Sequence, residues 1–368
     1  MLFRKLQNDR AVLPLILFLQ EQIGLWNESK RVRFPLIFAG YCLFVALPKL
    51  TSSYPDIPTC ICGIAELIFI SNVQCGGMLL WLQHDTFKPF VQELQSVADH
   101  LFLDHSMRSG KQYLIDFNHQ VHRYTNIYYF NAAFFIVFYM VTPVISSIWV
   151  YFRYMVKSNF LVNGTANGTS EVLMEEHQPA EFNLHMEQDF YGLEPRTNVV
   201  HYTIYTCFVL PVMIATAFTA HMKLLTTFTC ASYCGAFLHL LAMKLNHLRH
   251  MPRESMPDEL RDIVQTHQRT LNCIHLLVIT LQPMLLMQLV FCVYIWCSMM
   301  LYFVVVDELS LKFVNLAILF VVITIEMSGT CYFGTRLSTQ VRLDRIGGFV
   351  NPEKSSLRSF PSHNRVPN

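Results

Sequence analysis

The sequence predicts an all-α protein, a polytopic membrane helical bundle of six spans with a cytosolic N-terminus. Hydrophobic residues make up 53% of the chain and charged residues 14%, whereas soluble domains carry roughly 25% charged residues. The segment Ile127 to Phe152 is a run of 26 residues without Asp, Glu, Lys or Arg. A bilayer core about 30 Å thick needs roughly 20 apolar helical residues to cross it, and several further runs of this kind follow the same pattern.

Windows of about 20 residues identify six spans. The second has Glu66 as its only charge, the fifth has no charge, and the sixth is interrupted only by Glu326. The predicted spans are about 34–50, 59–82, 127–152, 199–222 with a cytosolic extension to about 249, 274–306 and 313–335, so that the transmembrane bundle occupies residues 34–340.

The stretch from Val199 to Met243 has 45 residues, with Lys223 as its sole Lys or Arg and no acid. It fits either two spans joined by a tight turn or one span whose helix continues past the membrane. With one span, 22 of the 27 Lys and Arg residues fall on the cytosolic side, whereas two spans would move the five from Lys244 to Arg269 outside. Because positive residues concentrate in cytosolic loops, we expect one long helix.

The same count makes residues 1–33 a cytosolic segment and places the loop between spans three and four outside. That loop is acidic and carries two N-glycosylation sequons, at Asn163 and Asn167. Such sequons act as acceptors on external surfaces. We therefore expect both asparagines to be glycosylation sites in a multi-pass plasma-membrane protein.

Neither end of the chain predicts a further span. Ala11 to Leu19 is too short for a cleavable signal sequence and contains Pro14, and its spacing predicts a cytosolic helix lying along the membrane surface. Residues 341–368 are polar, with several prolines and no apolar run, and predict a disordered tail.

The sequence contains no H-E-x-x-H, no P-loop, no G-x-S-x-G and no Gly-rich dinucleotide fingerprint. Two H-x-x-H pairs lie in polar helical segments without Cys or paired carboxylates, which favours solvated histidines over a metal site. We therefore expect no enzyme activity, no cofactor and no metal. The net charge of +1 gives no indication of nucleic acid, and the lipid bilayer is the expected partner.

An ionisable residue within a span is a functional candidate because burying a charge is costly. Glu66 fits either contact with a ligand or a packing hydrogen bond to a neighbouring span, and packing is the favoured interpretation for Glu326. Aromatic residues in the outer halves of spans three and four suit the wall of an apolar pocket; core packing, or an interface belt for Trp149, is the competing role. The ligand-binding candidates are Glu66, Ile70, Tyr139, Trp149, Tyr205 and Phe208.

Several short segments occur in the order and spacing of a known family. Gly24-Leu25-Trp26 precedes the first span, and the fourth helix continues into Phe237-Leu238-His239-Leu240-Leu241. His267-Gln268-Arg269-Thr270-Leu271 enters span five, and Leu286-Met287-Gln288 lies within it. Span six ends in Cys331-Tyr332-Phe333-Gly334-Thr335-Arg336-Leu337-Ser338, which matches the family pattern C-Y-F-G-x-x-L-S. Over about residues 1 to 340, the chain resembles the insect odorant receptors.

This resemblance implies a seven-helix fold with a cytosolic N-terminus, opposite to that of G-protein-coupled receptors. It implies a subunit that binds small volatile odorants and gates a non-selective cation channel, in a hetero-tetramer with a shared co-receptor, in the dendrite of an olfactory sensory neuron. In the family, odorants bind in the outer half, among spans two, three, four and six. The cytosolic ends of spans four to six, with the last helix, form the anchor where subunits meet.

The chain departs from the family after Ser338, where a seventh, pore-lining helix is expected and the polar residues 341–368 stand in its place. A non-functional truncated isoform and a gustatory receptor of the same superfamily stay open as alternatives. A G-protein-coupled receptor needs an external N-terminus and a D-R-Y-like triplet ending span three, whereas Asp344-Arg345-Ile346 lies in the tail. The identity of the odorant is not predicted, because apolar contacts discriminate weakly.

Overall fold

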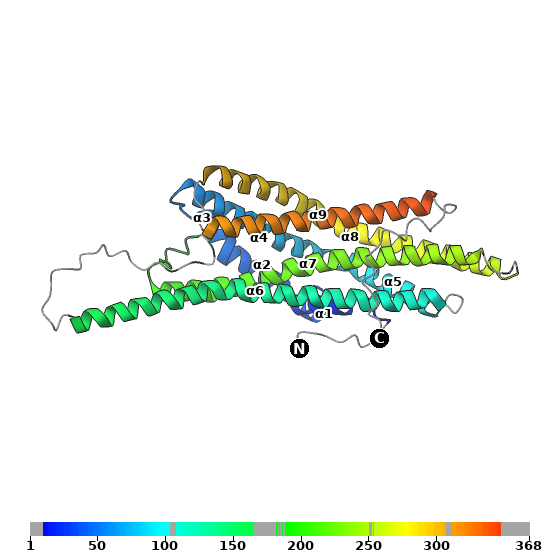
Figure 1. Ribbon diagram of the computed structural model, residues 1–368, viewed down its shortest axis with the longest axis horizontal. Coiled ribbons are helices and arrows are strands. Elements are labelled where there is room, and N and C mark those ends of the chain that lie inside the picture. Colours follow the sequence, from blue (N-terminus) through cyan, green and yellow to red (C-terminus); the bar gives the residue numbers. More distant parts are fainter. Residues whose placement is uncertain are drawn as a thin grey trace, which may run out of the picture.

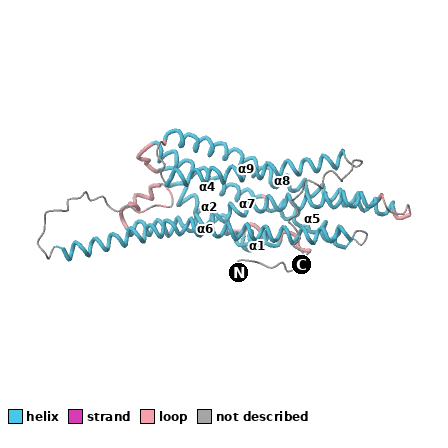
Figure 2. Tube along the Cα trace, viewed as in Figure 1, coloured by secondary structure: helices cyan, strands magenta, loops and turns pink. Residues whose placement is uncertain are grey.

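The computed structural model describes residues 10–103, 108–164, 182, 184, 186, 188–249, 252, 254–306 and 311–346. Over these residues the regular elements are helices, and one isolated β-bridge joins Phe190 to Leu193. The long helices run side by side along the longest axis of the molecule (Figure 1), and helix is the main structure along the described trace (Figure 2). The arrangement is a helical bundle, as the sequence predicts.

Eleven helical elements are found among the described residues. In chain order they are α1 (Pro14–Ile23), the 3₁₀ turn η1 (Glu28–Lys30), α2 (Arg33–Tyr41), the π-helical turn η2 (Cys42–Ala46), α3 (Leu47–Thr51), α4 (Ile57–Leu82), α5 (His84–Leu103), α6 (Arg108–Gly164), α7 (Val199–Leu248), α8 (Met256–Val305) and α9 (Leu311–Ile346).

Four helices among the described residues are long and apolar enough to cross a membrane: Arg33–Thr51, Ile57–Leu82, Val199–Leu248 and Met256–Val305. The predicted third and sixth spans, 127–152 and 313–335, lie within α6 and α9. Helices α7 and α8 have 50 residues each, about 75 Å at 1.5 Å per residue, against a bilayer core about 30 Å thick. Both therefore project well beyond the membrane.

Two boundaries follow from the helix ends. The stretch from Val199 to Met243 is one uninterrupted helix, without the turn that a two-span arrangement requires. Helix α9 continues to Ile346, so residues 341–346 are helical and the predicted disordered tail begins too early at 341. This segment contains neither Gly nor Pro before Gly347, so nothing in it breaks the helix. Residues 347–368 lie outside the described part of the chain.

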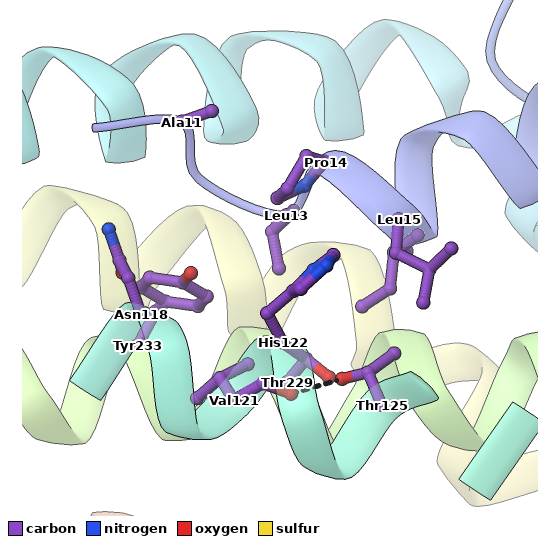
Figure 3. Close-up of a pocket in the computed structure, with 11 residues that line it drawn as sticks. Ala11, Leu13, Pro14, Leu15, Asn118, Val121, His122, Thr125, Thr229 and Tyr233 are labelled. Carbon is purple, nitrogen blue, oxygen red and sulfur yellow. Dashed lines mark hydrogen bonds between the residues drawn. The ribbon is translucent and has the colours of Figure 1, made fainter. Parts of the chain in front are cut away.

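Helix α1 packs against the bundle, and its position along the membrane surface stays a prediction. Leu13, Ile16 and Leu19 are almost fully buried. Figure 3 shows the start of α1 seated over α6 and α7, where Leu13 and Pro14 approach the side chain of Tyr233. The reason is that the cytosolic extensions of α6 and α7 supply an apolar surface that the first helix covers.

The Gly24-Leu25-Trp26 segment forms the turn that leads from α1 to the first span. Gly24 ends α1 with φ +81°, and a Cβ at this position would lie 2.3 Å from the Lys30 carbonyl oxygen. The imidazole of His84 bonds the Leu25 carbonyl oxygen at 3.1 Å. The Trp26 ring meets the rings of His84 and Phe87 edge-on. Only glycine fits the backbone at the turn, and Trp26 fixes the turn against α5.

The buried apolar side chains form three clusters. The largest joins α1, α4, α5, α7 and α8 towards the end of the molecule where α5 meets α6. A second, which we call the outer cluster, lies at the opposite end and includes Tyr41, Val45, Ile70, Phe190, Tyr205 and Val209. A third joins α4, α8 and α9. The opposite end is the one that the charge pattern assigns to the outside of the cell.

Candidate functional site

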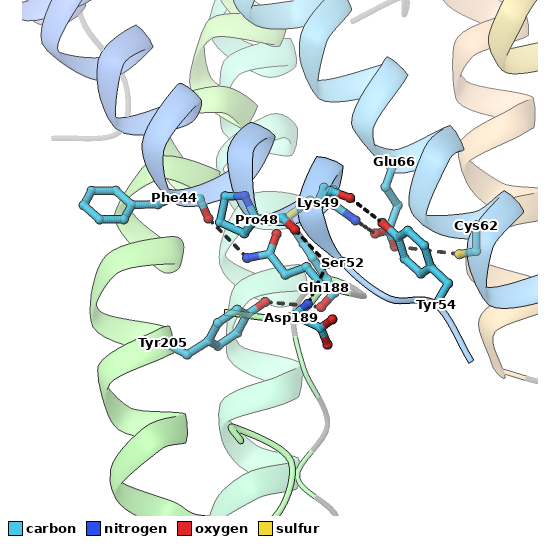
Figure 4. Close-up of polar contacts among 11 residues, drawn as sticks. Phe44, Pro48, Lys49, Ser52, Tyr54, Cys62, Glu66, Gln188, Asp189 and Tyr205 are labelled. Carbon is cyan, nitrogen blue, oxygen red and sulfur yellow. Dashed lines mark hydrogen bonds and ion pairs between the residues drawn. The ribbon is translucent and has the colours of Figure 1, made fainter. Parts of the chain in front are cut away.

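The outer cluster brings together two of the predicted ligand-binding residues. Ile70 comes from α4 and is 2% exposed, and Tyr205 comes from α7 and is 0% exposed. The hydroxyl of Tyr205 donates to the carbonyl oxygen of Met186 at 3.3 Å, and its ring meets that of Phe190 edge-on. The segment before α7 therefore packs on Tyr205 (Figure 4), and Phe190 of that segment shares the outer cluster with Ile70.

The π-helical turn η2 binds that segment through two of its backbone carbonyls. A π turn displaces backbone carbonyls from the regular helical ladder, and here the carbonyls of Leu43 and Phe44 accept hydrogen bonds from the loop. Gln188 Nε2 donates to the Phe44 carbonyl at 3.1 Å, and the Tyr191 hydroxyl donates to that of Leu43. Asp189 accepts the Ser53 backbone N–H at 2.8 Å. These bonds tie the loop to the first span.

Glu66, a third candidate, forms an ion pair with a neighbouring helix. Its carboxylate lies 2.6 Å from the Lys49 ammonium, and the Lys49 side chain is 0% exposed. The Cys62 thiol lies 3.9 Å from the other carboxylate oxygen. Tyr54 donates to the Lys49 carbonyl at 3.2 Å, and burial, followed by the charge of Glu66, raises the pKa of Tyr54 to about 12. Glu66 thus neutralises a buried cation.

The remaining candidates lie apart from this group. Trp149 is 54% exposed, and Phe208 is 47% exposed with its ring stacked on that of Phe44 at 4.8 Å. The side chain of Tyr139 lies outside the described residues, although its backbone belongs to α6. Asn163 is in the last turn of α6, and Asn167 lies outside the described residues. The structure does not gather the six candidates at one point.

The second intramembrane acid also pairs within the bundle. Glu326 accepts a hydrogen bond from Gln288 Nε2 at 2.8 Å, and its carboxylate lies 3.5 Å from the Lys223 ammonium. These three residues come from α9, α8 and α7. Gly76 of α4 lets the Lys223 stem pass, because a Cβ there would lie 3.0 Å from Lys223 Cδ. The contacts agree with the packing interpretation of Glu326.

A cavity of about 160 Å³ lies between α6 and α7. Its walls are Tyr129, Ala132, Ala133, Ile136 and Val137 of α6 and Ile214, Phe218, His221, Met222 and Leu225 of α7. On each helix these positions recur every three or four residues, so each helix presents one face. The small side chains of Ala132 and Ala133 leave room opposite Phe218. Ile136 also packs against the outer cluster, so the cavity borders the region of Ile70 and Tyr205.

None of these cavity residues was among the candidates predicted from the sequence. The acids within spans stood out as charges, whereas His221 did not, because a histidine does not interrupt an uncharged run. His221 was the available signal: it is an ionisable side chain near the cytosolic end of the predicted fourth span, 199–222. The facing alanines carried no signal of their own, because alanine is an ordinary residue of any helix.

Comparison with known families decides the class of this bundle. Residues 76–342 match the family model described as 7tm Odorant receptor. The chain belongs to the odorant receptor family. This receptor is therefore a multi-pass membrane protein of a family of receptors rather than enzymes. None of the curated proteins matches the chain significantly.

Among solved structures, the receptor is similar to the insect olfactory receptor OR5 from Machilis hrabei. The TM-score is 0.53 at 12% sequence identity, and the match covers 92% of this chain and 82% of that one. At this identity the likeness shows the fold. The family motif lies within α9, where Cys331, Tyr332 and Gly334 are exposed and the side chain of Phe333 is outside the described residues.

Proposed function

We propose that this receptor binds small volatile organic molecules in the membrane part of the bundle and gates a cation channel together with a co-receptor in a hetero-tetramer. The observation that carries the proposal is the apolar cavity between α6 and α7. A cavity of about 150 Å³ is enough to hold benzene, so one of about 160 Å³ suits a molecule with one small ring or a short chain. Volatile organic compounds are of this size and polarity.

The proposed binding region extends from this cavity to the outer cluster. Ile136 connects them, since it lines the cavity and packs against the cluster that holds Ile70 and Tyr205. Glu66 and Tyr139 stay candidates on the outer side. Exposed on the bundle surface, Trp149 and Phe208 are candidates for the entry path from the lipid rather than for the pocket.

We place the receptor in the plasma membrane, in the dendrite of an olfactory sensory neuron, with its N-terminus in the cytosol. The excess of Lys and Arg on the cytosolic side supports this orientation. Asn163, in the last turn of α6, and Asn167 then lie on the external side, where glycosylation occurs. A shift in mobility on removal of N-glycans, lost in the double variant N163Q/N167Q, is the expected result.

The test is a current recording with a panel of odorants from cells that express the chain with the co-receptor, alongside surface labelling. We expect an odour-evoked cation current that is absent from cells with the co-receptor alone. Ala133→Phe fills the cavity and is expected to reduce the current. Val141→Phe is the matched control, because Val141 is exposed on the same helix. Silence to the whole panel despite surface expression refutes the proposed function.

A further inference from the structure

The wall of the α6–α7 cavity carries polar groups on two side chains, Tyr129 and His221, and its other described lining side chains are apolar. The Tyr129 ring meets the Phe218 ring edge-on, with centroids 6.4 Å apart. His221 is half-buried and makes a hydrogen bond through Nδ1 to the hydroxyl of Tyr128, at 2.9 Å. Tyr128 precedes the cavity residue Tyr129 on α6. This bond therefore anchors the imidazole from outside the cavity.

The contact with the Tyr128 hydroxyl favours one tautomer of the ring. A phenol has one hydrogen to donate, and in an apolar setting a donor without an acceptor is costly. Among the described residues, Nδ1 of His221 is the acceptor that the Tyr128 hydroxyl reaches. If Nδ1 carried the hydrogen instead, the phenol hydrogen would have no acceptor there. Tyr128 therefore donates to Nδ1, and the neutral imidazole carries its own hydrogen on Nε2.

We propose that His221 Nε2–H is the specificity-determining donor of the cavity and selects small neutral ligands that carry a hydrogen-bond acceptor, such as aldehydes, ketones and esters. The inference rests on the proposed function and deepens it. A ligand oxygen that accepts from Nε2–H satisfies a donor that the apolar side chains of the wall cannot match. A hydrocarbon of the same shape leaves it unmatched, and a site built around a hydrogen bond disfavours such an analogue.

The volume of the cavity suits a ligand with about one small ring. Benzaldehyde and styrene are a matched pair of probes, because they have the same ring and differ by an oxygen in place of a methylene group. A neutral hydrogen bond contributes a modest net free energy, so we expect benzaldehyde to act at concentrations about 3- to 10-fold lower than styrene.

Two variants separate the donor from the structural role of the ring. In His221→Asn the side-chain oxygen lies near the position of Nδ1 and can still accept from Tyr128, but nothing donates from the position of Nε2. In His221→Gln the amide N–H₂ reaches the position of Nε2. Tyr129→Phe removes the competing hydroxyl of the cavity wall. All three are expressed with the co-receptor, checked by surface labelling, and titrated with both probes.

We expect the preference for benzaldehyde over styrene in the wild type, in His221→Gln and in Tyr129→Phe, and a ratio near one in His221→Asn. The proposal is overturned if both probes act equally on the wild type, if neither acts while other odorants evoke a current, if the preference survives in His221→Asn, or if Tyr129→Phe abolishes it. Silence to every odorant, by contrast, refutes the proposed function itself.

Discussion

Replacing Glu326 with glutamine removes the carboxylate that neutralises Lys223 in the interior of the bundle. The Lys223 side chain is 2% exposed and that of Glu326 is 17% exposed, with 3.5 Å between ammonium and carboxylate. At this distance Coulomb's law gives an attraction of about 5 kcal/mol for an effective dielectric constant of 20. Breaking a buried pair typically costs 3–5 kcal/mol because the other charge stays buried. Since Glu326 is partly exposed, we expect Glu326→Gln to lose about 3 kcal/mol of unfolding free energy.

A double-mutant cycle with Lys223→Met isolates the pair. Lys223→Met keeps an unbranched apolar stem and leaves Glu326 with its hydrogen bond from Gln288. The double variant Lys223→Met/Glu326→Gln has no unpaired buried charge, so it should lose at least about 1.5 kcal/mol less than the sum of the single variants. Equilibrium unfolding of the purified chain in mixed micelles measures all three. Asp85→Asn is the control, because Asp85 is exposed and its partner Arg31 lies 4.0 Å away.

The cycle refutes this account if the two single effects add within about 0.5 kcal/mol, since independent sites behave in that way. A loss in Glu326→Gln no larger than in Asp85→Asn refutes it equally. Either outcome means that the ammonium of Lys223 is solvated in the folded protein rather than neutralised by Glu326.

Three further variants test packing, the loop and the cytosolic end. Gly77→Ala should lower the unfolding free energy by about 1–3 kcal/mol, because its Cβ would lie 2.4 Å from Phe34 Cζ. Gly334→Ala is the control and should be neutral, because its Cβ meets nothing within 4 Å. Equal unfolding free energies for the two variants contradict this prediction. Tyr205→Phe should cost about 1 kcal/mol by removing the bond to the Met186 carbonyl, and a loss of odorant sensitivity at unchanged stability would instead make Tyr205 a ligand contact. Asp262→Asn should cost about 1–3 kcal/mol in thermal unfolding near neutral pH and little at low pH, and a loss independent of pH excludes the carboxylate as its cause.

The pH dependence of Asp262 follows from its partners. Burial raises the pKa of this carboxyl, but the hydrogen bond and charge of Lys244, followed by those of His100, outweigh burial and hold the pKa below its ordinary value. The carboxylate therefore contributes stability above its ordinary pKa of about 4, and this contribution disappears as the pH falls through the lower folded value. Lys244 is buried, so its need for a counter-charge persists at neutral pH.

Much of the fold was predictable because membrane helices leave strong one-dimensional signals. An uncharged run of 26 residues in 127–152 has few alternatives to a helix in lipid. The balance of Lys and Arg selected one long helix over two for Val199 to Met243, where the structure has a single helix. The end of α9 was harder to predict, because residues 341–346 include three charged residues and continue the helix beyond the apolar run.

The sequence indicated which residue types could form a ligand site, but not which of these residues lie together in the bundle. Ile70 and Tyr205 lie in one buried cluster, whereas Trp149 and Phe208 point out of the bundle. The face of a helix that meets its neighbours depends on how the helices rotate against one another, and a helix that is apolar on all sides gives little indication of that rotation. The cavity also depends on the rotation of α6 against α7, because Ala132 and Ala133 leave space only where they face Phe218.

The sequence by itself determined that this protein is a helical membrane bundle of the odorant receptor type, because hydropathy, charge placement and short motifs are local properties of the chain. Tertiary structure alone decided that Lys223 pairs with Glu326, that Lys49 pairs with Glu66, and that His221 faces a cavity with its Nδ1 held by Tyr128. Each of these depends on atoms brought within a few ångströms from distant parts of the chain. A hydrogen bond needs its donor and acceptor within about 3.2 Å, and the attraction of an ion pair is strongest at contact.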